Sequence, residues 1–314
     1  MKNIFTPTVL IISNIYDFST DFICQELSNK NINYLRINRD SLKDYEIFFD
    51  PLLPKITGTY NNLNFSITNE TLKSIYFRAP SFLRDIYQDT KDEEEQLIRT
   101  QWTAFLRYLI VFENVKWLNN PSDIYKAEIK SYQLYIANKI GFNVPKTIIS
   151  NKITKPLHEK IAIKSIDTAI ISLGEDEGFV YTEIYDRNEL SEEVFSSPFF
   201  IQEGLLPKVD LRVTVIEDEV IAIKIVNNQN DGGIDIDWRR LKNELHYEIY
   251  ELPEAVKKLC RQLLKELNLN FGGIDLVLHK NAYFFIEINP TGEWSWLQQT
   301  TGVKLDSIIA NSLI

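Results

Sequence analysis

Apolar residues recur along this chain with two periods, which predicts short strands mixed with amphipathic helices. The first 40 residues show both. An apolar run at 9–12 precedes a helical stretch that reaches about Asn29, with Ser19 as its candidate N-cap, and a second apolar run follows at 34–37. This order predicts a βαβ unit. The turn after the first run contains no glycine, so the glycine-rich fingerprint of dinucleotide-binding folds is absent.

Two further helices are expected before residue 141. After Lys91, the acidic residues at 92–95 suit the first turn of a helix, because negative charge there complements the helix dipole. The apolar face of this helix comprises Leu97, Trp102, Phe105, Leu106 and Leu109. The next helix is expected to run unbroken from Asp123 to Ile140, with Ser122 as N-cap and Gly141 as C-terminal cap.

The remaining pattern is mostly of the β type. One more helix should follow Pro253, which suits a first helical turn, and should reach Leu267. The predicted strands lie at 55–60, 64–68, 75–77, 147–149, 161–164, 179–184, 199–202, 209–216, 220–226, 274–278 and 283–288.

Composition narrows the class of protein. The chain has 314 residues and a net charge of −10, which argues against broad nucleic-acid binding. The two cysteines, Cys24 and Cys260, occupy apolar helical positions and are expected to be buried, reduced thiols. The N-terminus lacks the pattern of a signal peptide, and no apolar run approaches the roughly 20 residues that span a membrane. We therefore expect a cytoplasmic protein with no membrane contact.

A group of oxygen ligands is predicted near the C-terminus. In the strand at 283–288, Phe284, Ile286 and Ile288 should face the core, while Glu287 and Asn289 share the other face. A three-residue loop at 280–282 would place Asp275 opposite Glu287. Two adjacent carboxylates need a cation or a proton between them, and with an amide they suit Mg²⁺. The alternative is three exposed polar residues on a strand.

Cations form a second group. Asp210, Arg212 and Thr214 share a strand face, and a three-residue turn at 217–219 would place Lys224 opposite Arg212. Two cations so placed favour an anion between them, although a surface ladder of ion pairs is the alternative. Lys164 ends an apolar strand and Lys130 lies on a helix; each is either solvated or a phosphate ligand.

Several segments, taken in order, resemble the ATP-grasp superfamily, and within it the ligases that macrocyclise graspetides such as microviridins. The resemblance covers nearly the whole chain. It is carried by the Tyr-Phe-Arg-Ala-Pro motif at 76–80, residues 117–121, Lys130, residues 141–147, residues 202–206, Asp210 and Arg212, the Asp-Trp-Arg motif at 237–239, Asp275, residues 285–290, residues 292–294, and residues 301–302.

The resemblance implies an α/β (α+β) ATP-grasp fold. Its parts are an N-terminal βαβ domain at 1–118, a central α+β subdomain at 119–201 and a C-terminal antiparallel-sheet subdomain at 202–314. ATP would lie between the last two. One feature departs from many ATP-grasp enzymes: the phosphate-covering stretch from 165 to 178 has only two glycines, which places more of the phosphate binding on lysines and metal.

The resemblance also implies roles for individual residues. Arg212 would face the reacting acyl group and Arg239 the γ-phosphate, as catalytic residues, and Asp275, Glu287 and Asn289 would bind Mg²⁺. ATP would be bound by Lys130, Lys164, Gln202, Glu203, Gly204, Leu205, Asp210 and Arg239.

The implied reaction converts a side-chain carboxylate of a precursor peptide to an acylphosphate, which a Ser or Thr hydroxyl or a Lys amine then attacks. The peptide would have a leader segment and a core rich in acidic and hydroxyl side chains, and the enzyme would be a homodimer. Three alternatives stand beside this interpretation. They are an ATP-grasp ligase that adds an amino acid to a small molecule or protein tail, an ATP-grasp-type kinase, and a non-catalytic nucleotide-binding scaffold.

Overall fold

The computed structural model describes residues 4–78, 93–153, 158–167, 170–173, 176–227, 237–241 and 244–314. The chain forms two compact units. The first comprises Met1–Lys126, Leu267–Gly272 and Pro290–Ile314, and the second comprises Ala127–Glu266 and Gly273–Asn289. The division into three domains at residues 118 and 201 concerns finer boundaries and stays a prediction.

A parallel four-stranded sheet lies in the first unit, in the order β2-β1-β6-β7. Its strands are β1 (Val9–Ser13), β2 (Tyr34–Asn38), β6 (Ser74–Phe77) and β7 (Lys116–Leu118). Because β1 and β2 are parallel, a crossover must join them, and helix α1 (Phe18–Asn29) provides it. The predicted βαβ start is confirmed. The predicted cap is wrong: Asp17, not Ser19, caps α1 by accepting a hydrogen bond from the Thr20 N–H.

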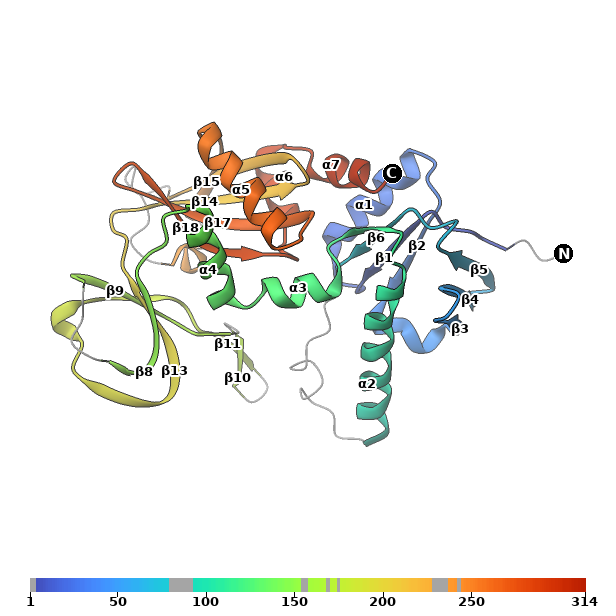
Figure 1. Cartoon of the computed structure of the whole chain (residues 1–314), viewed down its shortest axis with the longest axis horizontal. Coiled ribbons are helices and arrows are strands. Elements are labelled where there is room, and N and C mark those ends of the chain that lie inside the picture. Colours follow the sequence, from blue (N-terminus) through green and yellow to red (C-terminus); the bar gives the residue numbers. More distant parts are fainter. Residues whose placement is uncertain are drawn as a thin grey trace. The chain divides into compact units, whose positions relative to one another are not determined.

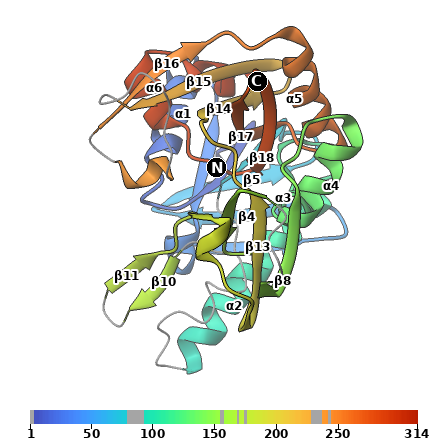
Figure 2. The ribbon, with the colours of Figure 1, turned by 90° about the vertical axis from the view of Figure 1, so that its left-hand side faces the viewer.

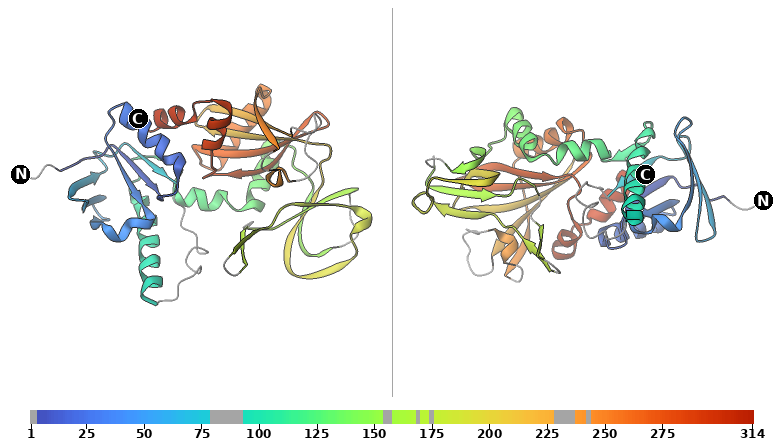
Figure 3. Two further views of the ribbon diagram at one scale, coloured as in Figure 1. Left: turned by 180° about the vertical axis from the view of Figure 1, so that it is seen from behind. Right: turned by 90° about the horizontal axis from the view of Figure 1, so that it is seen from below.

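The first unit also contains an antiparallel sheet, formed by β3 (Glu46–Asp50), β4 (Lys55–Tyr60) and β5 (Leu63–Thr68). Helix α2 (Glu93–Tyr108) places Phe105 edge-to-face against Phe49 of β3. Residues 91 and 92, where this helix was expected to begin, lie outside the described residues. Helices α6 (Ser295–Thr301) and α7 (Leu305–Ser312) complete the unit, and α7 packs against α1 (Figure 3).

The second unit contains three sheets (Figures 1 and 2). One has the order β12-β9-β13-β8 and consists of β8 (Thr147–Ile153), β9 (Lys160–Lys164), β12 (Glu183–Asp186) and β13 (Glu193–Glu203). The smallest is the hairpin of β10 (Ile170–Leu173) and β11 (Asp176–Phe179). The largest has the order β16-β15-β14-β17-β18, from β14 (Val209–Ile216), β15 (Glu219–Asn227), β16 (Leu245–Tyr250), β17 (Phe271–His279) and β18 (Ala282–Asn289). The first two residues of β17, Phe271 and Gly272, are assigned to the first unit.

One predicted strand is wrong. The run at 179–184 is interrupted, since β11 ends at Phe179 and β12 begins at Glu183. Just before β12, the Thr182 N–H donates to the carboxylate of Asp237 at 3.2 Å instead of to a neighbouring strand. A tertiary contact, invisible in the local pattern, therefore sets this boundary.

The predicted helix from Asp123 to Ile140 is also wrong. It is two helices, α3 (Pro121–Ala127) and α4 (Lys130–Ile140). The Gln133 side-chain amide donates to the Ala127 carbonyl at 2.7 Å, which satisfies an acceptor that the break would otherwise leave unpaired. The predicted C-terminal cap is confirmed, because Gly141 has a φ of 101°, which glycine adopts without strain.

Helix α5 (Glu254–Glu266) follows Pro253 as predicted, and it buries Val256, Cys260, Leu263 and Leu264. Burial raises the pKa of the Cys260 thiol to about 12, so this thiol is inert. Cys24 is only half-buried on α1, which corrects the expectation of a buried residue. Within the part of the chain that the structure describes, no helix is both long and apolar enough to cross a membrane.

Candidate active site

The carboxylates of Asp275 and Glu287 occupy paired positions on β17 and β18. The loop that joins the strands differs from the prediction: it has two residues, Lys280 and Asn281, both with positive φ. An even loop would by itself put Asp275 opposite Ile286. A β-bulge at Ile286 shifts the register by one residue, so that Asp275 pairs with Glu287 after all.

The bulge also changes which side chains enter the core. Phe284, Ile286 and Ile288 were expected on the buried face. Instead Phe285 and Ile288 are buried, whereas Phe284 and Ile286 are half-buried. The strand therefore changes face at Ile286, and a strict alternation of two residues cannot describe it.

Positive charges surround the carboxylate pair. The Arg212 Nη1 lies 3.1 Å from Asp275 Oδ1, and the Lys130 Nζ lies 3.7 Å from Glu287 Oε2. The two carboxyl groups respond differently. Burial and the neighbouring Glu287 raise the pKa of Asp275 to about 7, although Arg212 opposes this. Burial also disfavours charge on Glu287, but Lys130, Lys164 and Arg212 outweigh it and hold its pKa below the usual value.

Arg212 lies beside the carboxylate pair, but Lys224 does not lie opposite Arg212 as predicted. The turn between β14 and β15 has two residues rather than three, so Arg212 pairs with Ile223 and Lys224 pairs with Leu211. Lys224 lies 3.7 Å from Glu248 of β16 instead. Room for Arg212 comes from Gly273, where a Cβ atom would lie 3.1 Å from the Arg212 Nη1.

Lys164 is held by a chain of polar side chains. Its ammonium donates to Gln202 Oε1 at 2.8 Å, and Gln202 donates in turn to the Thr147 hydroxyl at 2.8 Å. Burial lowers the pKa of Lys164 to about 8, and the nearby charges of Lys130 and Lys208 act in the same direction. A partly desolvated ammonium of this kind favours an anionic ligand.

The segment that follows β13 approaches β9 closely. The N–H groups of Glu203 and Gly204 donate to the carbonyls of Lys146 and Lys160, each at 2.9 Å. A Cβ atom on Gly204 would lie 2.8 Å from the Lys160 Cβ, so only glycine fits here. A ligand contact from the backbone of Glu203 or Gly204 would therefore use a carbonyl group.

Two more predicted site residues, Asp210 and Arg239, form ion pairs. Asp210 is buried and pairs with Lys208, and burial raises the pKa of its carboxyl group. Asp237 is buried and holds Arg239 by both ends of the guanidinium fork, from Nε at 2.8 Å and from Nη2 at 2.6 Å. The charge of Arg239 acts on Glu287 and Asp275, so Arg239 belongs to the same electrostatic cluster.

Sequence reasoning missed Gln133. This residue is buried in the first turn of α4, four residues after Ile129 and three before Ile136. A polar residue at that spacing lies on the apolar face of the helix, which is the signal that could have identified it. Its side chain bonds to the backbone of Ile288, between Glu287 and Asn289.

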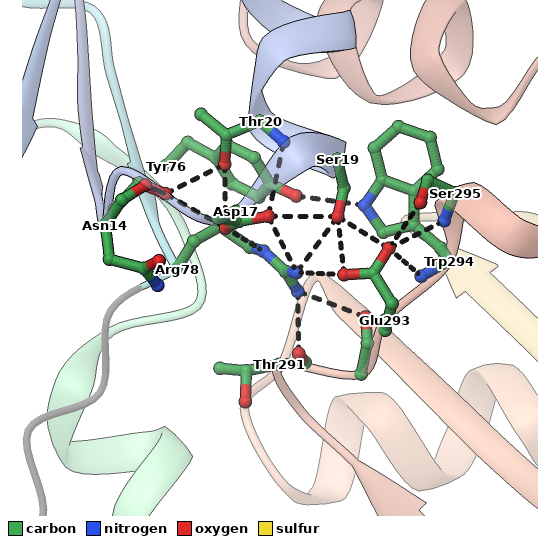
Figure 4. A network of polar contacts seen from close by, with 12 residues as sticks. Asn14, Asp17, Ser19, Thr20, Tyr76, Arg78, Thr291, Glu293, Trp294 and Ser295 are labelled. Carbon is green, nitrogen blue, oxygen red and sulfur yellow. Dashed lines mark hydrogen bonds and ion pairs between the residues drawn. The ribbon is translucent and has the colours of Figure 1, made fainter.

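Arg78, from the Tyr-Phe-Arg-Ala-Pro motif, is buried at the centre of a network in the first unit (Figure 4). It donates to Asp17 at 3.2 Å, to Glu293 at 3.2 Å and to the carbonyl of Thr291 at 2.6 Å. Ala79 and Pro80 lie outside the described residues. The network ties the turn after β1 to the chain segment that follows Asn289.

Comparison with known proteins agrees with this arrangement. The sequence profile of the RimK-like ATP-grasp domain matches residues 126–313, more than half of the chain. The chain belongs to the RimK-like ATP-grasp family. The predicted fold class is thereby confirmed. No curated protein sequence matches this member of the family.

Solved structures resemble this ATP-grasp protein over nearly its whole length. A Chryseobacterium gregarium RiPP-associated ATP-grasp ligase, in complex with ADP and a leader and core peptide, is 24% identical, with a TM-score of 0.80 and coverage of 98% of this chain and 96% of that chain. The macrocyclase MdnC of Microcystis aeruginosa, bound with precursor peptide MdnA, is 20% identical, with a TM-score of 0.77 and coverage of 97% and 98%. The ATP-grasp ligase PsnB, complexed with a phosphomimetic variant of its minimal precursor, Mg and ADP, is 16% identical, with a TM-score of 0.75 and coverage of 99% and 98%.

Proposed function

We propose that this ATP-grasp protein is an ADP-forming ligase that closes ester or amide macrocycles in a ribosomally made precursor peptide. It would join Asp or Glu side chains to Ser, Thr or Lys side chains. The observation that carries the proposal is the Asp275–Glu287 pair, on which the positive charges of Lys130, Lys164, Arg212 and Arg239 act. Such a cluster suits a polyphosphate with a divalent cation. The peptide complexes of the structural relatives support a precursor peptide as the acceptor substrate.

Asp275, Glu287 and Asn289 fit a bound Mg²⁺. The raised pKa of Asp275 reflects a carboxylate that is desolvated beside another, and a divalent cation would relieve that repulsion. Two carboxylates and one amide leave coordination positions for water and phosphate oxygens, as Mg²⁺ prefers. Among the described residues there is no larger cluster, of three or more His, Cys, Asp or Glu side chains, that could hold a metal. When bound, Mg²⁺ supplies charge neutralisation to the phosphate oxygens of the nucleotide.

The nucleotide would be bound by residues from both large sheets of the second unit and from α4. Lys130 and Lys164 would contact the phosphates, and Arg239, oriented by Asp237, would approach the γ-phosphate. The segment of Gln202, Glu203, Gly204 and Leu205 would contact the adenine, and Asp210 would contact the nucleotide beside it.

Arg212 would face the reacting acyl group. Its Nε is buried and has no hydrogen-bond partner among the residues that the structure describes, although its Nη1 pairs with Asp275. A buried donor without a partner is costly, so an oxygen of the bound substrate is its natural acceptor. After phosphoryl transfer to the peptide carboxylate, Arg212 would stabilise the oxyanion that forms when a hydroxyl or an amine attacks the acylphosphate. Collapse of this oxyanion expels phosphate and forms the ester or amide, with loss of the nucleophile's proton.

Intact-mass measurement tests the proposal. The protein is incubated with ATP, Mg²⁺ and each short peptide that an open reading frame next to its gene could encode. Each ring closed subtracts the mass of one water from the peptide, whereas a kinase product gains a phosphate and an amino-acid ligase product gains a residue. The double variant Glu287→Gln with Asn289→Ala should abolish the dehydration. Unchanged dehydration in this variant would contradict the metal assignment.

We further propose a cytoplasmic location and a homodimeric state. The ATP requirement supports the first. Light scattering during size-exclusion chromatography tests the second, and a mass of one chain, 36.7 kDa, would contradict it.

A further inference from the structure

Gln133 forms a two-point contact with the backbone of one residue. Its Nε2 donates to the Ile288 carbonyl at 2.8 Å, and its Oε1 accepts from the Ile288 N–H at 3.1 Å. The same Nε2 donates to the Ala127 carbonyl at 2.7 Å. The Gln133 side chain is buried, so these three bonds are shielded from competing water.

This contact lies on the outer edge of the sheet. β18 is the last strand of its sheet, so on that edge every second residue presents an N–H and a carbonyl that no further strand of the described sheet pairs. Before the bulge, Asn143 covers two of these residues: it donates from its side chain to the Tyr283 carbonyl at 3.0 Å and accepts at its own carbonyl from the Phe285 N–H at 2.8 Å. Beyond the bulge the outward-facing residue is Ile288, and Gln133 takes the place of the missing strand there.

Ile288 lies between Glu287 and Asn289 in the sequence. One hydrogen bond would leave this part of the strand free to pivot, whereas a donor and an acceptor together fix both its position along the strand and its rotation. Helix α4 carries a second residue of the site, Lys130. This residue lies three positions before Gln133 and therefore on a neighbouring part of the helix surface. Lys130 supplies the positive charge 3.7 Å from Glu287.

We propose that Gln133 is a positioning residue, which sets the geometry of Glu287 and Asn289 through the backbone of Ile288. The inference rests on the proposed function of these two residues as Mg²⁺ ligands. Removal of a group that hydrogen-bonds to a metal ligand, and so orients it, typically lowers metal affinity by about 10–100-fold. Loss of the Gln133 amide should therefore weaken Mg²⁺ binding, in addition to any effect on stability.

The test compares Gln133→Met with a matched control, Gln298→Met. Gln298 is a buried glutamine in the first unit that also makes a donor and an acceptor bond to one residue, Asp306, at 2.6 and 2.9 Å. Mg²⁺ is titrated calorimetrically into full-length protein with saturating ADP and no peptide, so nothing turns over. We expect the Mg²⁺ concentration for half-saturation to rise about 10-fold in Gln133→Met and to stay unchanged in Gln298→Met.

A second readout needs no ligand. Amide hydrogen exchange at Ile288 should be slow in the wild-type protein and clearly faster in Gln133→Met. If Gln133→Met does not fold, Gln133→Asn, which keeps the amide but is one methylene shorter, should show a smaller change of the same sign.

The outcomes separate the two proposals. Wild-type Mg²⁺ affinity in Gln133→Met, or an equal loss in Gln298→Met, would overturn the positioning role and leave the proposed function standing. No Mg²⁺-dependent ADP binding in the wild-type protein would overturn the proposed function and this inference together.

Discussion

Asp275 lies opposite Glu287 although the turn between their strands has an even number of residues, because a bulge at Ile286 supplies the extra residue. A bulge is a common way to redirect a side chain beside a functional site. Here it places two carboxylates on one face of an edge hairpin, where cations from β14, β9 and α4 act on them. The following predictions test the consequences of that arrangement and of the contacts that support it.

Lys130→Met should raise the pKa of Glu287. The Lys130 charge is among the causes that hold this pKa down, because an opposite charge nearby favours the ionised carboxylate. Carbon-13 NMR titration of the labelled carboxyl group measures the change in the nucleotide-free protein. Lys139→Met, on the exposed last turn of the same helix, serves as the control and should leave the titration unchanged.

Arg212→Ala should abolish product formation and retain ATP binding. The Arg212 guanidinium pairs with Asp275, and its buried Nε has no partner among the described residues. This N–H could therefore donate to an oxygen of the acyl group. Calorimetric titration with ATP and Mg²⁺ is compared with peptide mass. A loss of nucleotide binding would instead assign Arg212 to the phosphates.

Gly204→Ala should destabilise the protein by about 1–3 kcal/mol, as overpacking at a rigid contact does. The new Cβ would lie 2.8 Å from the Lys160 Cβ and 2.9 Å from its backbone carbon, so strands must separate. Gly273→Ala is the control, because its Cβ would meet only the flexible end of Arg212. Denaturant unfolding measures both variants, and equal stabilities would contradict the prediction.

Asp17→Asn should destabilise the protein at pH 7 by about 3 kcal/mol, because it leaves the buried Arg78 with one carboxylate fewer. Burial would raise the pKa of Asp17, but the Arg78 charge and its hydrogen bonds outweigh burial and hold that pKa below the usual value. Because the pKa of Asp17 is lowered in the folded state, its charge stabilises the fold above the unfolded-state pKa of about 4. This stabilisation is lost as the pH falls through the folded-state pKa of Asp17.

Denaturant unfolding at a series of pH values provides the check. The free energy of unfolding of the wild-type protein should fall steeply below about pH 4, and that of Asp17→Asn should fall less over the same range. The control is Asp21→Asn on the exposed side of α1, which should retain the wild-type acid limb. The same steep limb in Asp17→Asn would show that other carboxylates govern acid unfolding.

Local pattern predicted the elements that bury one face or follow a single period. Neighbouring residues alone were enough to predict the βαβ start, the Gly141 cap, the helix after Pro253 and the strand that contains Arg212. The ordered motifs also predicted the ATP-grasp fold, because the order of motifs along the chain does not depend on the conformation of the loops between them.

Tertiary structure decided the features in which distant residues compete with local preference. Gln133 satisfies a carbonyl at the break between α3 and α4, and Asp237 takes the N–H that would have continued a strand at Thr182. Turn length and the bulge at Ile286 together set the partner of Asp275, and neither can be read from alternation because each shifts it by one residue. Sequence thus named the carboxylates and cations of this site, while hydrogen bonds across the fold determined which of them meet.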